Sequence, residues 1–226
     1  EVVVPVEDMT ELGAVSEEPA EGSAAGGERR GSIWPHVEER VVDLVEQHRS
    51  TIVFANSRRL AERLTARLNE IAAERAEARQ AEDGPGLDTP RSSAAPPAAI
   101  MAQSGQSRGA EAIIAKAHHG SVSKEQRAII EDDLKRGRLP CVVATSSLEL
   151  GIDMGSVDLV VQIESPPSVA SALQRVGRAG HQVGEVSRGV LFPKHRGDLA
   201  QTAVSVERMR SGAIEKMAIP ANPLDV

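Results

Sequence analysis

Short runs of β-branched and other apolar residues recur along this chain, and stretches with helical periodicity separate them. This alternation constrains the fold more than any other feature, because it is typical of an α/β protein with a parallel sheet. It predicts five or six strands flanked by helices. The runs are residues 51–55, 112–117, 140–144, 158–163 and 190–192.

The stretches between these runs carry apolar residues at the spacing of one helix face. The first spans residues 37–45 and follows Pro35, which suits the first turn of a helix. Ser123 and Gln126 have the spacing of a capping box, and Gly137 fits the end of the same helix. Further helices are expected over residues 60–71, 168–176 and 199–209.

The charge of the chain is unevenly distributed. The 226 residues carry a formal charge of −7, and residues 1–32 alone contribute −6, with eight acidic and two basic residues. The rest of the chain is therefore close to neutral, so the acidic total does not argue against nucleic acid. With two Phe, one Trp and no Tyr, the chain offers little base-stacking surface, so a bound strand would be held by its backbone.

Composition also indicates the boundaries of the folded part. Residues 1–31 start with an apolar run and continue as a Gly-, Ala- and Glu-rich segment, which favours a lead-in strand and a linker. Residues 72–110 change from an Ala-, Glu- and Arg-rich helix extension to a stretch rich in Pro, Gly and Ser, which indicates a long low-complexity insertion. Residues 213–226 are expected to be an exit segment of a domain within a longer protein.

Several classes of function are disfavoured by what the sequence lacks. A single cysteine, Cys141, excludes an intrachain disulfide and is expected to be an inert core residue. No apolar run is long enough to span a membrane. The pair His118-His119 lacks the spaced partners of a metal site, so no metal site is expected. Trp34, beside Pro35, is expected to pack rather than bind.

Polar and small residues follow the ends of four predicted strands. Ligands of open α/β sheets bind at this edge, and helix N-termini there favour phosphate oxygens. Ordinary N-capping explains each loop taken alone, but their joint occurrence favours a phosphate-backbone site. The loops are residues 56–59, 118–123, 145–153 and 164–167.

Arg175 and Arg178 share one helix face, near Gly177 and Gly180. Two cations at a helix C-terminus are explained by the helix dipole as well as by a phosphate ligand, and the planar guanidinium favours phosphate. Asp153 is either a turn residue or an acceptor for sugar hydroxyls. The chain has no Gly-Lys pair and no Asp-Glu pair, hence no phosphate-binding P-loop and no carboxylate pair for Mg²⁺.

In this order, the motifs resemble those of the second RecA-like domain of superfamily 2 helicases. The segment IVFANSRRLAERL resembles motif IV, HHGSVSKEQR the next strand-end motif, VVATSSLELGIDMG motif V and QRVGRAGH motif VI. The resemblance covers residues 32–212 without the insertion at 72–110. It implies a RecA-like parallel sheet flanked by helices, with a long low-complexity insertion.

The resemblance also implies roles for individual residues. Arg178 matches the arginine that reaches the γ-phosphate of ATP, and Arg175 is the neighbouring catalytic cation. Gly151, Asp153, Gln174 and His181 fall on the nucleotide side, although many relatives have an arginine where this chain has His181. The positions implied to contact the nucleic-acid backbone are Asn56, Ser57, Arg58, His119, Gly120, Ser121, Thr145 and Ser146.

From the resemblance we expect half of an ATP-dependent 3′-to-5′ DNA translocase or helicase, inactive as an ATPase by itself. ATP with Mg²⁺ would be held mainly by a preceding RecA-like domain, a winged-helix domain would follow, and single-stranded DNA or a DNA/RNA hybrid would be the partner. A bacterial cytoplasmic, nucleoid-associated location is implied. Alternatives are a non-catalytic nucleic-acid or protein-binding module and a dinucleotide-binding domain, the latter disfavoured because no G-x-G-x-x-G follows the first strand.

Overall fold

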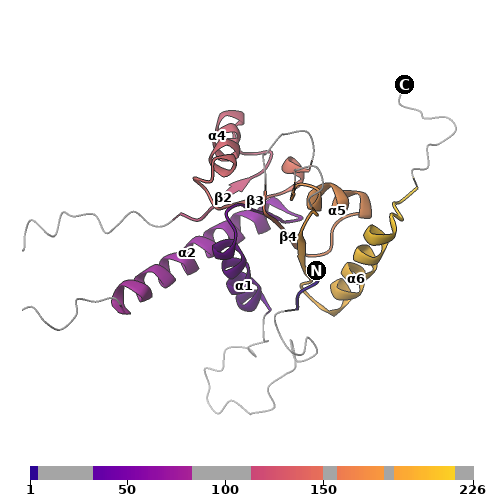
Figure 1. Cartoon of the computed structure of the whole chain (residues 1–226), viewed down its shortest axis with the longest axis horizontal. Coiled ribbons are helices and arrows are strands. Elements are labelled where there is room, and N and C mark those ends of the chain that lie inside the picture. The colour runs from indigo at the N-terminus through magenta and orange to yellow at the C-terminus, as the bar shows by residue number, and fades with distance from the viewer. Residues whose placement is uncertain (5–32, 83–112, 150–156, 181–185, 217–226) are drawn as a thin grey trace, which may run out of the picture.

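Five short strands form one parallel sheet in this computed structural model, which describes residues 1–4, 33–82, 113–149, 157–180 and 186–216 (Figure 1). The order across the sheet is β2-β3-β1-β4-β5, so the first strand in the sequence lies at the centre. The strands are β1 Thr51–Phe54, β2 Ala115–His118, β3 Cys141–Ala144, β4 Leu159–Ile163 and β5 Gly189–Phe192. The predicted parallel α/β architecture is confirmed.

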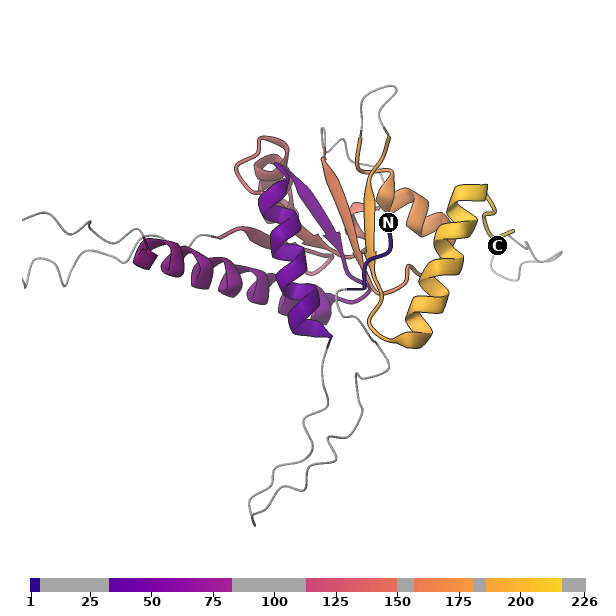
Figure 2. The same ribbon diagram turned by 60° about the horizontal axis from the view of Figure 1, so that its bottom comes forward.

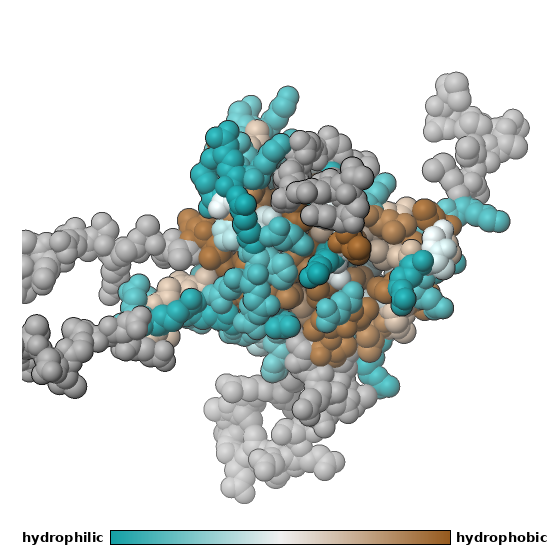
Figure 3. All heavy atoms as spheres, viewed as in Figure 1, coloured by the Kyte–Doolittle hydropathy of each residue, from teal (hydrophilic) through white to brown (hydrophobic). Residues whose placement is uncertain are grey.

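The first residues of the chain extend this sheet at its β5 edge. The Leu191 amide donates to the Glu1 carbonyl oxygen, and the Val3 amide donates to the Leu191 carbonyl oxygen, each at 2.9 Å. In Figure 3, hydrophobic residues gather around this N-terminus, between α1 and α6. The apolar start of the chain therefore serves as an added edge segment beside the five strands.

The helices occupy the places that the apolar spacing predicts. Pro35 lies in the first turn of α1, Ser123 accepts a hydrogen bond from the Gln126 amide at the start of α4, and Gly137 has a positive φ of 68° after its end. The elements are α1 Trp34–Gln47, α2 Arg58–Glu82, α4 Lys124–Lys135, α5 Val169–Val176 and α6 Arg196–Ser211, with a short 3-10 helix, η1, at Ser146–Leu148.

Helices cover both faces of the sheet (Figure 2). The inward side chains of α1 and α2 pack with Val53, Val143 and Val161 on one face. On the other face, Ile130 and Leu134 of α4 pack with alternate strand residues such as Phe54 and Val142. The sheet is thus buried on both sides, which leaves its edges and strand ends for function.

One predicted strand is displaced. Residues 112–117 were expected to be extended, whereas β2 starts at Ala115 and ends at His118. The side chain of Asn69 on α2 accepts hydrogen bonds from the Ile114 and Ala115 amides, both at 2.9 Å, and donates to the Ala115 carbonyl oxygen at 3.0 Å. The Asn69 side chain thus satisfies backbone amide and carbonyl groups of residues 114 and 115, at the point where β2 begins.

The stretch at residues 72–110 begins as the expected helix. Helix α2 continues through residue 82, which confirms the expected helix extension, and residues 83–110 lie outside the described part of the chain. None of the described helices is long and apolar enough to cross a membrane.

Candidate functional site

The parallel register brings the predicted strand-end loops to one edge of the sheet. Phe54 at the end of β1 lies beside Ala144 of β3, which in turn lies beside His118 of β2, and Phe54 also lies beside Gln162 of β4. The polar residues that follow these strands are therefore neighbours in space, as the sequence predicts.

The loop after β1 combines a helix cap with an exposed cation. The Ser57 hydroxyl accepts a hydrogen bond from the Leu60 amide at 3.2 Å at the start of α2. The Arg58 guanidinium donates to the Ser121 hydroxyl at 2.9 Å, which joins the loop after β1 to the loop after β2. Both side chains are exposed, so a basic group and two hydroxyls lie together at this edge.

In the loop after β2, the exposed and buried positions differ in what they can bind. Gly120 is exposed, and open space surrounds the position that a Cβ would occupy. His119 is buried, and its Nδ1 accepts from the Ser121 amide at 3.3 Å. The ring proton is therefore on Nε2, which donates to Glu62 at 2.6 Å. The His119 ring shapes the loop, so its predicted contact with nucleic acid would have to be made by its backbone.

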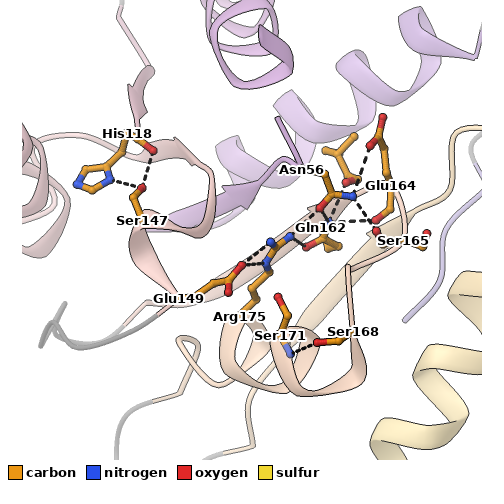
Figure 4. A network of polar contacts seen from close by, with 11 residues as sticks. Asn56, His118, Ser147, Glu149, Gln162, Glu164, Ser165, Ser168, Ser171 and Arg175 are labelled. Atoms are coloured by element: carbon orange, nitrogen blue, oxygen red, sulfur yellow. Dashed lines mark hydrogen bonds and ion pairs between the residues drawn. The ribbon is translucent and has the colours of Figure 1, made fainter. Parts of the chain in front are cut away.

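Sequence reasoning missed the part played by His118. Its ring is fully buried, with Nδ1 2.8 Å from the Ser147 hydroxyl and Nε2 2.8 Å from Glu131 Oε1. The Ser147 hydroxyl also lies 2.8 Å from the His118 carbonyl oxygen. Burial lowers the pKa of His118, and the Glu131 carboxylate opposes this shift. The ring thus joins the β2 end to η1 (Figure 4).

Thr145 and Ser146 follow β3 directly. The Thr145 amide donates to the His118 carbonyl oxygen at 3.2 Å, and its hydroxyl makes no capping bond to η1. Thr145 is half-buried and Ser146 is exposed. The structure thus holds the backbone of this turn in place and presents two hydroxyls beside the Gly120 loop.

Arg175 on α5 lies at the centre of a buried polar network (Figure 4). Its Nε donates to Glu149 Oε1 at 2.7 Å, and its Nη2 also contacts that oxygen. Its Nη1 donates to Asn56 Oδ1 at 3.0 Å and to Gln162 Oε1 at 2.8 Å. The guanidinium also lies over the Phe54 ring, 5.2 Å from its centroid. Arg175 therefore joins α5 to three neighbouring segments.

This placement changes the interpretation of two predicted site residues. Arg175 is only 2% exposed and its donors are taken by protein acceptors, so it fits a positioning role and not the catalytic contact that we expected. Asn56 is exposed, but its amide is engaged as well, because Nδ2 donates to the Ser165 carbonyl oxygen at 2.7 Å. Glu149 and Gln162 escaped sequence reasoning. For Glu149 the sequence did hold a signal, because its carboxylate lies between Leu148 and Leu150. A carboxylate that is buried with such apolar neighbours requires a cationic partner.

Arg178, one turn further along the chain, has a different environment. Its side chain is half-buried, and Nη2 donates to the Glu149 carbonyl oxygen at 2.8 Å. Glu149 thus holds Arg175 by its side chain and Arg178 by its backbone. Gln174 on α5 is exposed. Gly151, Asp153 and His181 lie outside the described residues, so their expected roles stay predictions.

The local backbone structure explains why glycine occupies positions 177 and 180, near these arginines. A Cβ on Gly177 would lie 2.9 Å from the Leu173 carbonyl oxygen, and Gly180 has a φ of 70°. The Gly180 amide donates to the Val157 carbonyl oxygen at 3.1 Å, where Ala179 forms a parallel bridge with Val157. The sequence suggests that these glycines leave room for another backbone or a ligand, and at Gly180 it is the backbone of Val186 and Ser187 that approaches. The chain conformation accounts for both.

The first turn of α5 is capped from two directions. The Ser168 hydroxyl accepts from the Ser171 amide at 3.0 Å, and the Glu215 carboxylate accepts from the Val169 amide at 2.7 Å and the Ala170 amide at 3.2 Å. These backbone hydrogen bonds lower the pKa of Glu215. The segment after α6 is thereby attached to α5, the helix that ends just before Arg178.

Metal chemistry and thiol chemistry find no support at this edge. Among the described residues, no group of three or more His, Cys, Asp or Glu side chains could hold a metal ion. Cys141 is buried, and burial raises the pKa of its thiol to about 12. In the described part of the chain, the polar groups at this edge include hydroxyls, backbone amides and arginines.

Comparison with known proteins points in the same direction. Residues 98–182 match the family described as "Helicase conserved C-terminal domain". The chain is 63% identical over 225 residues to the "Lhr helicase/ probable uracil glycosylase" of Mycolicibacterium smegmatis, and 54% identical over 229 residues to the "Lhr helicase/uracil glycosylase" of Escherichia coli. Both matches cover 100% of this chain but only 14% of the relative.

A solved structure extends the likeness to three dimensions. It is described as Mycobacterium smegmatis helicase Lhr bound to ssDNA and AMP-PNP, and it matches with a TM-score of 0.72 and 58% sequence identity. The match covers 99% of this chain and 23% of that chain. The expected RecA-like fold and the resemblance of the motifs to superfamily 2 helicases are confirmed.

Proposed function

Because the chain belongs to the Lhr-type superfamily 2 helicases as their second RecA-like domain, we propose that it is half of an ATP-dependent 3′-to-5′ DNA translocase or helicase. One observation carries the proposal. Arg175 joins α5 to the Asn56 loop and to Glu149, so the helix that directly precedes Arg178 is tied to the loops that would hold DNA. Its polarity follows the family resemblance.

The nucleic-acid side of the proposal uses the strand-end loops. Ser57, Arg58, Gly120, Ser121 and Thr145 present hydroxyls, a cation and open backbone at one edge. Such groups contact phosphate oxygens without reading bases, so they suit a motor that must pass over any sequence. The bound strand would be single-stranded DNA or the DNA strand of a DNA/RNA hybrid.

The nucleotide side uses Arg178. ATP supplies the transferable phosphoryl group, and Arg178 would stabilise the charge that develops on it during hydrolysis. The half-buried position of this side chain fits an arginine whose head emerges at a domain interface. Mg²⁺ and most of the ATP would be held by the preceding RecA-like domain, because the described residues contain no carboxylate cluster for a metal.

Coupling between the two sides would follow from the buried network. If Arg178 moves toward the nucleotide when the two RecA-like domains close, Arg175 would move with it, since the Arg178 amide donates to the Arg175 carbonyl oxygen at 3.0 Å in the turn that follows α5. Asn56 and Glu149 would transmit that shift to the loops after β1 and β3. We place the intact protein in the bacterial cytoplasm at the nucleoid, with a winged-helix domain after the exit segment.

The test is Arg178→Ala in the full-length enzyme. We expect turnover to fall by about 10³–10⁵-fold while ATP binding changes little, because an arginine finger acts mainly in the transition state. Arg136→Ala removes an exposed cation after the end of α4 and serves as the control. DNA-stimulated ATP hydrolysis and nucleotide binding are measured for both variants. Near-normal turnover by Arg178→Ala would contradict the assignment.

A second measurement separates a motor domain from a non-catalytic binding module. Isothermal titration of single-stranded DNA into this domain joined to its preceding domain is carried out with and without AMP-PNP. In a motor, the affinity for single-stranded DNA must depend on the bound nucleotide, because each cycle of hydrolysis has to alternate a tightly and a weakly DNA-bound state. Equal affinity in both conditions would favour the module.

A further inference from the structure

The only tryptophan of the chain lies beside the candidate DNA-binding loops, at a hollow of about 500 Å³. Trp34 begins α1, and Ser57 in the wall belongs to the loop after β1. The hollow is lined by Trp34, Ser57, Arg59, Leu60, Arg63 and Glu164. Trp34 packs against the hydrophobic core, as expected, and is only partly buried there. The rest of its side chain lines the hollow, although the low aromatic content led us to expect no base-stacking surface on this domain.

The tryptophan ring and the cations are fixed relative to one another. Arg59 and Arg63 are four residues apart and therefore lie on the same face of α2. The Arg63 guanidinium lies over the Trp34 ring, with its carbon 4.4 Å from the ring centroid. A cation over the ring holds the indole in one orientation. The wall thus combines a half-buried aromatic side chain with two exposed arginines.

The single acid in the wall is neutralised by protein groups. Glu164 Oε1 accepts from Lys194 Nζ at 2.8 Å. Its Oε2 accepts from Asn56 Nδ2 at 3.4 Å (Figure 4). Arg59 and Arg63 therefore give the hollow a positive character. Glu164 also has a φ of 66°, uncommon for a residue with a side chain. Such backbone strain is found more often at functional sites.

The position of the hollow continues the row of loops. The sheet order β2-β3-β1-β4 places the Gly120, Thr145 and Ser57 loops side by side, and the hollow follows between the ends of β1 and β4. Ser57 lies in both the row and the hollow. A backbone that passes over these loops would reach Arg59 and Trp34 next.

We propose that this hollow binds one nucleotide of single-stranded DNA, with the phosphate at Arg59 and Arg63 and the base packed against Trp34. The proposal rests on the proposed function, since it extends the path of a strand held by the loops. It assigns to this domain a base contact at the part of Trp34 that lines the hollow and that Arg63 leaves uncovered. Contact with an aromatic side chain holds a base without sequence preference, because every base has an aromatic ring.

The experiment compares the affinity of oligo-dT for the full-length enzyme with its affinity for three full-length variants, Trp34→Leu, Trp34→Phe and Arg59→Ala. Loss of a stacking side chain weakens single-strand binding by roughly tenfold, so we expect this for Trp34→Leu and substantial recovery for Trp34→Phe. Arg59→Ala should lower the slope of log affinity against log salt by about 0.7 for the lost phosphate contact. Arg136→Ala is the matched control for a lost exposed cation, and thermal melts check that every variant is folded.

Failure of this proposal and failure of the proposed function have different signatures. Arg58→Ala tests the loops themselves. If Arg58→Ala weakens binding while Trp34→Leu and Arg59→Ala bind as the wild type does, the hollow is not a DNA site and the loops are. If none of the three variants changes binding, the proposed path over the loops is wrong as well. Equal loss in Trp34→Leu and Trp34→Phe, with an unchanged salt slope in Arg59→Ala, would also overturn the nucleotide site.

Discussion

Arginines form two very different networks in this domain. At the carboxyl edge of the sheet, Arg175 is buried and donates to Glu149, Asn56 and Gln162. Between α1 and α2, Arg75 is partly exposed and contacts Asp43 at 2.9 Å and Glu46 at 3.1 Å. The first network joins segments far apart in the sequence, and the second joins two adjacent helices.

The two networks differ in whether water can solvate a charge whose partner has been removed. When an exposed ion pair breaks, water solvates both partners, so the net contribution of such a pair is small. When a buried pair loses one partner, the other remains as an unpaired charge in a poorly solvated site. The burial of Arg175 therefore makes the geometry of α5 and its loops depend on one side chain, whereas the α1–α2 network distributes its effect over many contacts.

The largest effect on stability is expected from Arg175→Ala. Removing this cation leaves Glu149 unpaired, and breaking a buried ion pair typically costs about 3–5 kcal/mol of unfolding free energy. Urea denaturation of this domain measures the loss. The matched variant replaces both partners, Arg175→Met with Glu149→Leu, and should recover much of the stability because no charge is left buried.

The stability of Arg175→Ala tests whether the buried network differs in strength from the exposed one. If Arg175→Ala unfolds at nearly the wild-type urea concentration, the network at the sheet edge is as weak as a surface one. Restored stability in the double variant without restored DNA-stimulated ATP hydrolysis would support a positioning role for Arg175, because packing would be recovered while the tie to the Asn56 loop would not.

His118 should make the stability of the same edge depend on pH. Burial lowers its pKa below the ordinary value of 6.5, against the opposing effect of the Glu131 carboxylate, and nearby Arg127 lowers it further. The unfolded chain then takes up the proton first as the pH falls, so stability is complete above about pH 6.5 and decreases below it. Urea midpoints between pH 7.5 and 5.5 measure the slope.

The control for this dependence uses two glutamine variants. His118→Gln should flatten the change in midpoint between pH 7.5 and 5.5, whereas His36→Gln, at an exposed position on α1, should keep it. A wild-type midpoint that rises toward pH 5.5, or a slope unchanged in His118→Gln, would show that Glu131 holds the proton on the ring in the folded state.

Much of the fold could be predicted from the sequence because its signals are local. Strands β1, β3, β4 and β5 lie within a residue or two of the apolar runs that predict them. Helix α6 begins at Arg196, earlier than its apolar residues indicate, because the His195 ring caps a polar first turn by accepting from the Asp198 amide at 3.1 Å. Apolar spacing carries no information about such a turn.

The site was less predictable, because its contacts depend on distant residues. That polar residues gather at one edge follows from parallel strands alone. The burial of Arg175 depends on Asn56, which is 119 residues away, and on Glu149, which is 26 residues away. The hollow at Trp34 depends in the same way on the meeting of α1, α2 and the β4 end. A motif identifies a residue type, and only the packing shows which way its side chain faces.

The smallest effect is expected from Arg75→Gln on the exposed network. Its partners are 38–50% exposed, so the loss should be below about 1 kcal/mol, several times less than for Arg175→Ala. In 1 M NaCl the Debye length is about 3 Å, so the loss should shrink further, whereas the loss in Arg175→Ala should hardly change. Urea denaturation of both variants at low and high salt provides the measurement. A loss in Arg75→Gln that equals that of Arg175→Ala and persists in salt would mean that the α1–α2 contacts hold the fold as firmly as the buried edge does, and burial would no longer separate the two networks.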